Sequence, residues 1–306
     1  MTKSRLRVGT RGSALARWQA NWVADRLRHL GAQVEIVEIA TSGDKDQRDS
    51  IQNIGRTGVF TKEIHTAVLN GEADIAVHSL KDLPTETVEG LVLAAVPERE
   101  SCCDVLVSHT AESLADLPIG AKVGTGSLRR QAQLRHLRAD LQIVGIRGTV
   151  DTRLRRLADG EYAAIVLAAA GLNRLRLVAN VVEELAPPRM LPAPGQGALG
   201  LECHREASDI LKLLGQLQHP DSRAATDAER AMLAMLHAGC SAPVGAWSRM
   251  EQGELVLDGL VASLDGQRIL RASARGTSPR AMQLGQQVAQ ALIEQGAAEI
   301  IQAARM

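Results

Sequence analysis

The chain has 306 residues, of which 45% are hydrophobic but only 2% aromatic, so Leu, Val, Ile and Ala must build its cores. This length suits two or three domains, and the aliphatic composition is typical of α/β proteins. Basic and acidic residues balance at 35 each, which argues against a general nucleic-acid-binding protein, because such proteins carry a basic excess.

The sequence gives little support for a membrane span, a metal site or a disulfide. No apolar run approaches the ~18 residues of a membrane span, and the N-terminal segment lacks the apolar stretch of a secretory signal. The four cysteines (Cys102, Cys103, Cys203 and Cys240) show no zinc-type spacing. The adjacent pair is a poor disulfide candidate in a reducing compartment. We therefore expect a cytoplasmic protein.

The N-terminal elements alternate strand, helix and strand. Residues 5–10 and 34–41 are predicted as strands. Residues 13–31 carry the apolar spacing of an amphipathic helix, with Ser13 as its N-cap and Gly31 as its stop. This order predicts a βαβ opening.

A polar stretch, residues 43–58, separates that opening from a predicted helix at 61–71 and an apolar strand at 73–80. The strand ends at Lys81 and Asp82, and ligands of open α/β sheets gather at the carboxyl ends of strands. A surface salt bridge is the alternative interpretation of that pair. The polar stretch is flanked by glycines and has few anchoring residues, so we expect a mobile flap over a cleft.

Composition changes at residues 97–104, where a second series of strands and helices begins. Its predicted strands are residues 104–108, 121–126, 141–146 and 163–168, and the last three each precede a helical pattern. The series ends in a Pro-rich segment at 187–200. We expect hinges at both edges of this series.

A third unit follows residue 218. It contains a predicted helix at 225–236, alternating strands at 253–264 and 267–276, and a closing helix from Pro279 onward. This pattern indicates an α+β module without an internal repeat.

Arginines gather in the second series. Eight of them stand between Arg129 and Arg156, against two acids, Asp140 and Asp151. Two Gly-Thr turns, at residues 124–134 and 146–154, precede helices there and could offer backbone N–H groups to an anion. The plainer interpretation is helix capping plus solvated arginines. Because like charges without acids repel unless a ligand neutralises them, we favour a ligand with several carboxylates or phosphates.

Several motifs occur in an order that resembles the porphobilinogen deaminase (hydroxymethylbilane synthase) family over essentially the full chain. They are VGTRGSALARWQA, GVFTKE, DIAVHSLKDLPTE, GTGSLRRQAQL, IRGTVDTRL, AAIVLAAAGLNRL, LPAPGQGALGLEC and GCSAPVGAW. The resemblance implies two α/β domains similar to the lobes of periplasmic binding proteins, plus a smaller C-terminal α+β domain. Domain 1 would comprise residues 1–98 and 198–218, domain 2 residues 99–197, and domain 3 residues 219–306.

The same resemblance implies the activity. The family is a transferase that deaminates four porphobilinogen molecules and joins them head-to-tail into the linear tetrapyrrole hydroxymethylbilane, in porphyrin and haem biosynthesis. The chain would grow on a dipyrromethane cofactor held by a thioether to Cys240, with no metal, nucleotide, nucleic acid or membrane involved, in a monomer. On its own, Cys240 could instead be a small buried hydrophobe.

Site residues are carried over by position. Asp82 would be the catalytic carboxylate. The implied cofactor-binding residues are Ser13, Lys81, Asp82, Thr125, Ser127, Arg129, Arg130, Arg147, Gly148 and Cys240. The implied substrate-binding residues are Arg11, Phe60, Arg147, Arg153, Arg174 and Gln196.

The chemistry explains the residue types. Loss of ammonia from porphobilinogen gives an electrophile that a pyrrole α-carbon attacks, and positive charge develops on the pyrrole nitrogens. A carboxylate ~4 Å away at an effective dielectric near 20 would be worth about 4 kcal/mol, or roughly a thousandfold in rate. Each pyrrole also carries an acetate and a propionate, which the arginines would bind.

The chain departs from the family pattern at a few positions. Asn53 and Thr57 stand where many members have lysines, Gly126 replaces a common serine, and His237-Ala238 precedes the cysteine loop. We therefore expect Arg56 to meet substrate carboxylates as the flap closes.

Two other functions remain open. The first two domains alone would suit a non-enzymatic two-lobed anion-binding protein. His237, three residues before Cys240, also suggests a cysteine hydrolase, although no orienting acid or oxyanion hole is recognisable. Cys102 and Cys103 have no counterpart in the family, and we expect them to be structurally minor.

Overall fold

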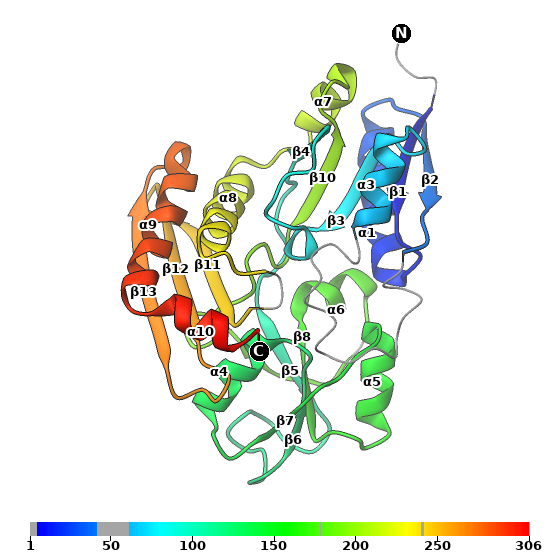
Figure 1. The fold of residues 1–306 in the computed structure, drawn as a ribbon. Helices are drawn as coiled ribbons and strands as arrows, with labels where there is room; N and C mark the ends of the chain where they lie inside the picture. The colour runs from blue at the N-terminus through cyan, green and yellow to red at the C-terminus, as the bar shows by residue number, and fades with distance from the viewer. Residues whose placement is uncertain (1–4, 42–60, 178, 240–241, 306) are drawn as a thin grey trace.

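The structure is a computed structural model that describes residues 5–41, 61–177, 179–239 and 242–305. Its elements form three parts that meet near the centre of the molecule (Figure 1). Each part is built on one β-sheet, two of five strands and one of three. The prediction of two α/β domains and a smaller C-terminal α+β domain is confirmed.

The first sheet has the strand order β2-β1-β3-β10-β4. All of its strands run in one direction except β10, which is antiparallel to its neighbours β3 and β4. Because β10 follows the whole second sheet in sequence, the chain leaves the first sheet after β4 and later returns to it. The strands are β1 (Leu6–Thr10), β2 (Val34–Glu38), β3 (Ile75–Ser79), β4 (Leu91–Ala95) and β10 (Leu199–His204), and the helices are α1 (Ala14–His29), α3 (Lys62–Leu69) and α7 (Ser208–Gly215).

The second sheet repeats this pattern. Its order is β7-β6-β8-β5-β9, and here β5 is the antiparallel fourth strand. Two crossover segments, residues 96–103 and 186–198, therefore join the two sheets. The strands are β5 (Asp104–Ser108), β6 (Lys122–Gly124), β7 (Gln142–Val144), β8 (Ala164–Ala168) and β9 (Val181–Leu185), and the helices are α4 (Leu128–Leu137), α5 (Val150–Ala158) and α6 (Ala169–Leu175).

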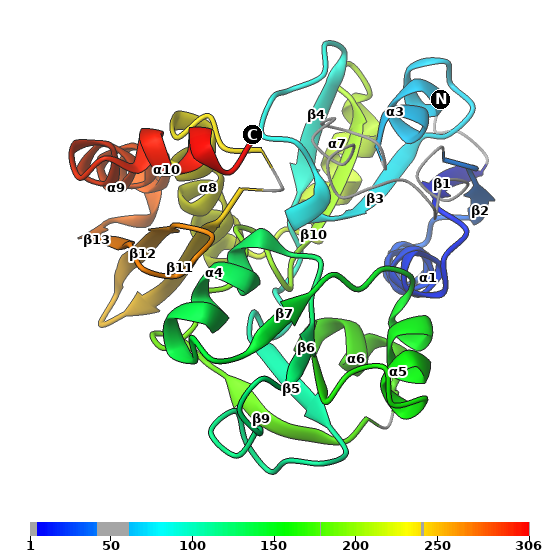
Figure 2. The ribbon, with the colours of Figure 1, turned by 60° about the horizontal axis from the view of Figure 1, so that its bottom comes forward.

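The third part is an antiparallel sheet covered by helices. Its elements are α8 (Pro220–Met235), β11 (Val244–Glu251), β12 (Glu254–Ala262), β13 (Ile269–Gly276), α9 (Ala281–Glu294) and α10 (Ala297–Ala303). A two-residue turn joins β11 to β12, and both of its residues have positive φ, 52° at Gln252 and 84° at Gly253. Such turns match the twist of the paired strands. Helices α8 and α9 lie side by side over the sheet (Figure 2), and all of these elements share one apolar core.

Local capping fixes where helices begin. The Ser13 hydroxyl accepts a hydrogen bond from the Ala16 backbone N–H at 3.3 Å, which confirms Ser13 as the N-cap of α1. Helix α8 begins at Pro220, before the predicted start at residue 225. The reason is that the His219 ring accepts from the Ser222 N–H at 3.2 Å, while proline suits the first helical position.

None of the described helices is long and apolar enough to cross a membrane.

Candidate active site between the three parts

The carboxyl end of β3 supplies two neighbouring site residues. A short 3-10 turn, η2 (Leu80–Asp82), follows the strand directly. Lys81 is half-buried and Asp82 is exposed. Burial lowers the pKa of Lys81 to about 8, with Asp82 acting in the opposite direction and Arg130 adding to the decrease. The pair therefore stands at the edge of the first sheet, and arginines of the second part are close enough to lower the pKa of Lys81.

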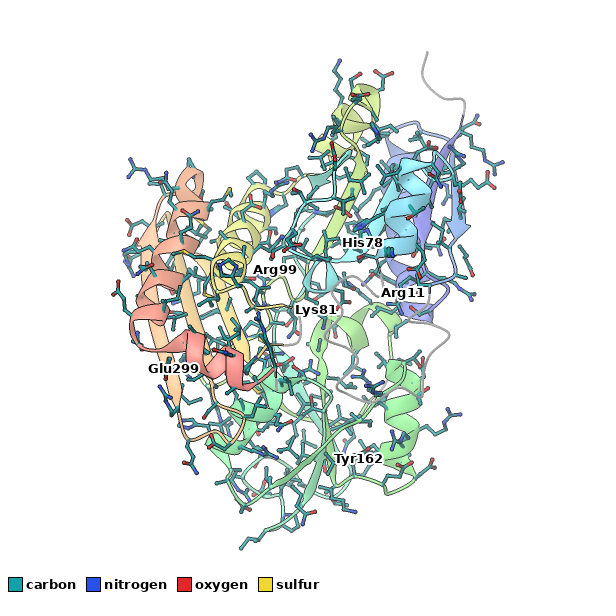
Figure 3. The ribbon with its side chains drawn as sticks, viewed as in Figure 1. Arg11, His78, Lys81, Arg99, Tyr162 and Glu299 are labelled. Carbon is teal, nitrogen blue, oxygen red and sulfur yellow. The ribbon has the colours of Figure 1, made fainter. Side chains whose placement is uncertain are left out.

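The loop after β1 lies at the same edge. Arg11 and Ser13 are both half-buried there, and Figure 3 places Arg11 at the end of the first part that is nearest to the second. Ser13 caps α1, and the buried Gln19 of that helix donates to the Ser79 hydroxyl at 2.8 Å. This bond ties the first turns of α1 to the end of β3. Sequence reasoning did not single out Gln19.

The two Gly-Thr turns of the second part are both capped. The Ser127 hydroxyl accepts from the Arg130 N–H at 3.4 Å at the start of α4, and the Thr149 hydroxyl accepts from the Thr152 N–H at 3.4 Å at the start of α5. Thr125 is buried and its hydroxyl accepts from the Ser127 N–H at 3.2 Å. The capping interpretation thus describes part of what these turns do.

The expectation that the arginines lack acidic partners is wrong for Arg129 and Arg130. Both donate to Asp104, which begins β5, at 2.7 Å each. All three side chains are buried. The two guanidinium groups hold the pKa of Asp104 well below its usual range, although burial opposes this. Asp104 was missed because it lies outside the arginine-rich segment, yet an acid at the head of an apolar strand was a usable signal.

One polar atom in each of two arginines has no hydrogen-bond partner among the described residues. They are Nε of Arg129 and one terminal nitrogen of Arg147, and both atoms are buried. Buried donors are normally satisfied. These two nitrogens therefore suit a bound anion.

Arg153 connects the second part to Asp82 electrostatically. Its Nε donates at 2.9 Å to the carbonyl of Gly148, whose φ of 106° is accessible mainly to glycine. Burial lowers the pKa of Arg153 to about 10, Arg130 lowers it further, and Asp82 acts in the opposite direction. Arg153 of the second part therefore lies close enough to the first part for its pKa to respond to Asp82.

The segment 186–198 carries Gln196, which is fully buried and joins the two sheets. Its Oε1 lies 3.4 Å from Nζ of Lys81, and its Nε2 donates to Asp104 at 2.8 Å. Arg174 of α6 donates to the Gly197 carbonyl at 2.5 Å. The Arg174 guanidinium also lies 5.9 Å from the centre of the Trp18 ring of α1.

The third part also contributes residues to the region around Lys81 and Arg129. A pocket of about 30 Å³ is lined by residues of all three parts, including Lys81, Ser127 and Arg129. Gly239 and Ala242, the described residues that flank positions 240 and 241, also line it. Cys240, Phe60, Arg56 and the stretch 43–58 lie outside the described residues.

A further buried network clamps the third part to the crossovers. The Glu229 carboxylate of α8 accepts two hydrogen bonds from Arg99, at 2.8 and 3.1 Å. It also accepts from the backbone N–H groups of Gly195 at 2.7 Å and Ser248 at 2.9 Å. Figure 3 places Arg99 near Lys81, where the parts meet. The sequence signal for Glu229 was an acid within the apolar spacing of a helix.

One group of possible metal ligands occurs in the described part of the chain, away from this pocket. Nε2 of His65 and Nε2 of His78 lie 2.8 and 3.1 Å from the same Glu202 oxygen, and all three side chains are buried. The imidazoles lower the pKa of Glu202 to about 2 although burial opposes this. The three residues join α3, β3 and β10.

Solved structures with a similar chain path include two binding proteins. A nutrient-binding protein from Burkholderia cenocepacia bound to methionine is 15% identical, with a TM-score of 0.42, covering 68% of this chain and 89% of that one. A periplasmic binding protein from Salmonella typhimurium with high arginine specificity is 14% identical, with a TM-score of 0.39, covering 70% and 91%.

Sequence relatives and family models are much closer. A porphobilinogen deaminase from Desulforudis audaxviator is 49% identical over 96% of both chains. One from Xanthomonas axonopodis pv. citri is 48% identical over 97% of this chain and 98% of its own. The model "Porphobilinogen deaminase, dipyromethane cofactor binding domain" matches residues 6–212, and "Porphobilinogen deaminase, C-terminal domain" matches residues 224–294. The matches to the family models and the identity to these relatives both show that this chain belongs to the porphobilinogen deaminase family.

Proposed function

We propose that the chain is a hydroxymethylbilane synthase whose active site is the junction of its three parts. The activity is that of its family, a transferase of porphyrin and haem biosynthesis that joins four porphobilinogen molecules into a linear tetrapyrrole. The observation that carries our assignment of the site is the small pocket lined by Lys81, Ser127, Arg129 and the residues that flank Cys240. Three separate parts of the chain thus converge beside one cysteine position.

The residues around this pocket fit the dipyrromethane cofactor. When bound, dipyrromethane supplies a free pyrrole α-carbon as the acceptor for incoming substrate. Cys240 would hold it by a thioether. Its acetates and propionates need cations and N–H donors, and the buried donors of Arg129 and Arg147 without described partners meet that need. Ser13, Thr125, Ser127, Arg130 and Gly148 would complete the cofactor site.

Asp82 would act as the catalytic carboxylate. It lies on a tight turn after β3, next to Lys81 and within the electrostatic reach of Arg153. A fixed negative charge at this position would stabilise positive charge as it develops on the pyrrole nitrogens.

Substrate carboxylates would meet the remaining basic residues. Arg11 lies on the first part, while Arg147 and Arg153 lie on the second. Arg174 and Gln196 fix the segment 186–198 beside them. Arg174 donates to the Gly197 carbonyl of this segment, and Gln196 of the same segment donates to Asp104 of β5. Phe60 would pack against a pyrrole ring.

We further propose that the three parts are the domains 1–98 with 198–218, 99–197 and 219–306. Their support is that each segment contributes to one sheet.

We also expect the protein to be a cytoplasmic monomer. The three described cysteines are free, as suits a reducing compartment. Sedimentation of the purified enzyme tests the oligomeric state.

Intact-mass measurement tests the assignment most directly. The purified chain should exceed its sequence mass by one two-pyrrole adduct, and Cys240→Ser should lose both the adduct and turnover of porphobilinogen. Cys203→Ala is the matched control, because this buried thiol has a pKa raised by burial to about 11 and should remain unmodified. An unmodified yet fully active chain would contradict both the covalent cofactor and the assigned site. A chain that binds anions but does not convert porphobilinogen would instead indicate a non-enzymatic two-lobed binding protein.

A further inference from the structure

Two adjacent thiols lie in the first crossover, beside the proposed site. Cys102 and Cys103 are consecutive in sequence, and both are half-buried and free. Neither the fold nor the proposed reaction uses these thiols. We propose that Cys102 and Cys103 form an oxidisable dithiol, a site where hydroperoxides reversibly close a disulfide between neighbouring residues and so slow the enzyme.

The surroundings make Cys102 the reactive member. The hydrogen bond from Cys103 lowers the pKa of Cys102, against the effect of burial, and the nearby Arg99 guanidinium acts in the same direction as the hydrogen bond. The thiolate is the form that attacks an oxidant. The same hydrogen bond raises the pKa of Cys103, followed by burial and by Glu184. Removing the thiolate charge from Cys102 therefore eases ionisation of Cys103.

The chemistry then balances in two steps. The Cys102 thiol attacks one oxygen of hydrogen peroxide, which gives a sulfenic acid and releases one water molecule. The Cys103 sulfur next attacks the Cys102 sulfur and displaces a second water molecule, forming the S–S bond. Two thiols have lost two protons and two electrons, and the peroxide has been reduced to two molecules of water.

Adjacency makes this disulfide labile. Neighbouring Cα atoms across a trans peptide are about 3.8 Å apart, whereas ordinary disulfides join Cα atoms about 4.4–6.8 Å apart. Closing the ring must therefore distort the backbone between the two cysteines and store strain. Strained disulfides have higher reduction potentials and are readily reduced. The pair is thus unsuited to structural crosslinking and suited to reversible modification.

The peptide that this distortion would move belongs to the hydrogen-bond network of the proposed site. The Cys102 carbonyl accepts from Gln196 Nε2 at 2.8 Å, and the same nitrogen donates to Asp104 at 2.8 Å. Asp104 in turn holds Arg129 and Arg130. Displacing the Cys102 carbonyl removes one of the three hydrogen bonds that orient the buried Gln196 side-chain amide. The effect on turnover rests on the proposed function, whereas formation of the disulfide does not.

The experiment treats the holoenzyme with hydrogen peroxide and maps its cysteines by mass spectrometry without reduction. We expect the peptide that contains Cys102 and Cys103 to lose two hydrogen atoms. Turnover should fall about tenfold, equivalent to about 1.4 kcal/mol, and dithiothreitol should restore it. Cys102→Ser and Cys103→Ser keep every backbone bond described above, so each should retain untreated activity and its cofactor while losing the reversible inactivation.

Controls separate the outcomes. Cys203→Ala should remain as sensitive to peroxide as the parent enzyme, because the Cys203 thiol is buried in β10. The proposal is overturned if the two thiols stay reduced under peroxide, if the disulfide forms without change in turnover, or if the double serine variant is inactivated equally. A chain that forms the disulfide but never converts porphobilinogen would support the dithiol and contradict the proposed function.

Discussion

Asp104 shows how one buried carboxylate organises a positively charged site. It is bonded to Arg129 and Arg130, and it accepts from Gln196 as well. One carboxylate therefore faces two guanidinium groups. Asp104, Arg129 and Arg130 all lie close enough to the half-buried Lys81 to affect its pKa. The local excess of positive charge survives pairing, so the site remains attractive to carboxylates.

At Asp82 we predict that an amide preserves the fold and removes most of the turnover. Asp82→Asn keeps the shape of the side chain but cannot balance a developing cation. The full interaction of about 4 kcal/mol is reduced by solvent, because Asp82 is exposed. We therefore expect kcat to fall about a hundredfold. Glu86→Gln, on the same loop, is the matched control and should leave kcat unchanged. A near-normal kcat in Asp82→Asn would remove the carboxylate from its assigned role.

Arg56 carries a separate prediction, although it lies outside the described residues. Because Asn53 and Thr57 carry no charge, Arg56 is the basic residue expected to meet substrate carboxylates. A contact present in both ground and transition states makes Arg56→Ala raise KM more than it lowers kcat. The effect should be about 1 kcal/mol and weaken with salt. Kinetics at two ionic strengths, with Arg48→Ala as control, test this, and an unchanged KM at low salt would refute it.

Local patterns predicted most elements, but they could not predict their partners. The apolar spacing and the Ser13 cap anticipated α1, and apolar runs anticipated β3, β5 and β8. The pairing of β10 with β3 and β4 depends on contacts between distant segments, so only the family resemblance suggested it. For the same reason Asp104 and Glu229 were missed. Their partners lie in other elements, and propensity and periodicity describe only neighbours in sequence.

Three elements of the first part are held together by Glu202, and this predicts a pH dependence. The pKa of Glu202 is lowered from 4.5 to about 2 by the two imidazoles. A depressed carboxyl pKa stabilises the fold above the unfolded value and loses that contribution as pH falls through the folded value. The stabilisation is therefore complete above about pH 4.5 and disappears toward about pH 2.

Glu202→Gln tests that contribution. At neutral pH it should lower the free energy of unfolding by about 3 kcal/mol. Urea unfolding between about pH 7 and about pH 3 should show the difference from the parent protein shrinking only below about pH 4.5. The exposed Glu206→Gln, just beyond β10, should change stability by less than about 0.5 kcal/mol. A deficit that stays constant down to the lowest pH would contradict the depressed pKa.

At the scale of the whole molecule, the two crossovers are where the parts are coupled. Residues 96–103 and 186–198 join the two sheets, and both contribute to the bonds around Glu229 of the third part. Segments that join α/β lobes act as hinges when they are loosely held. Here the first carries Arg99 and the second carries Gly195, and one carboxylate binds both. Glu229 therefore limits how far the lobes and the third part can move independently.

We predict that Glu229→Gln weakens the entire assembly. The side chain of Glu229 is 0% exposed and that of Arg99 is 10% exposed, so the substitution leaves a buried guanidinium without its counter-charge. Breaking such a pair typically costs about 3–5 kcal/mol. Asp227→Asn on the same helix is the matched control. It breaks the more exposed pair with Arg223 and should cost less than about 1 kcal/mol. Urea unfolding measures both costs, and limited proteolysis should cut the Glu229→Gln variant faster within 186–198. Equal stability of the two variants would mean that Glu229 does not couple the three parts.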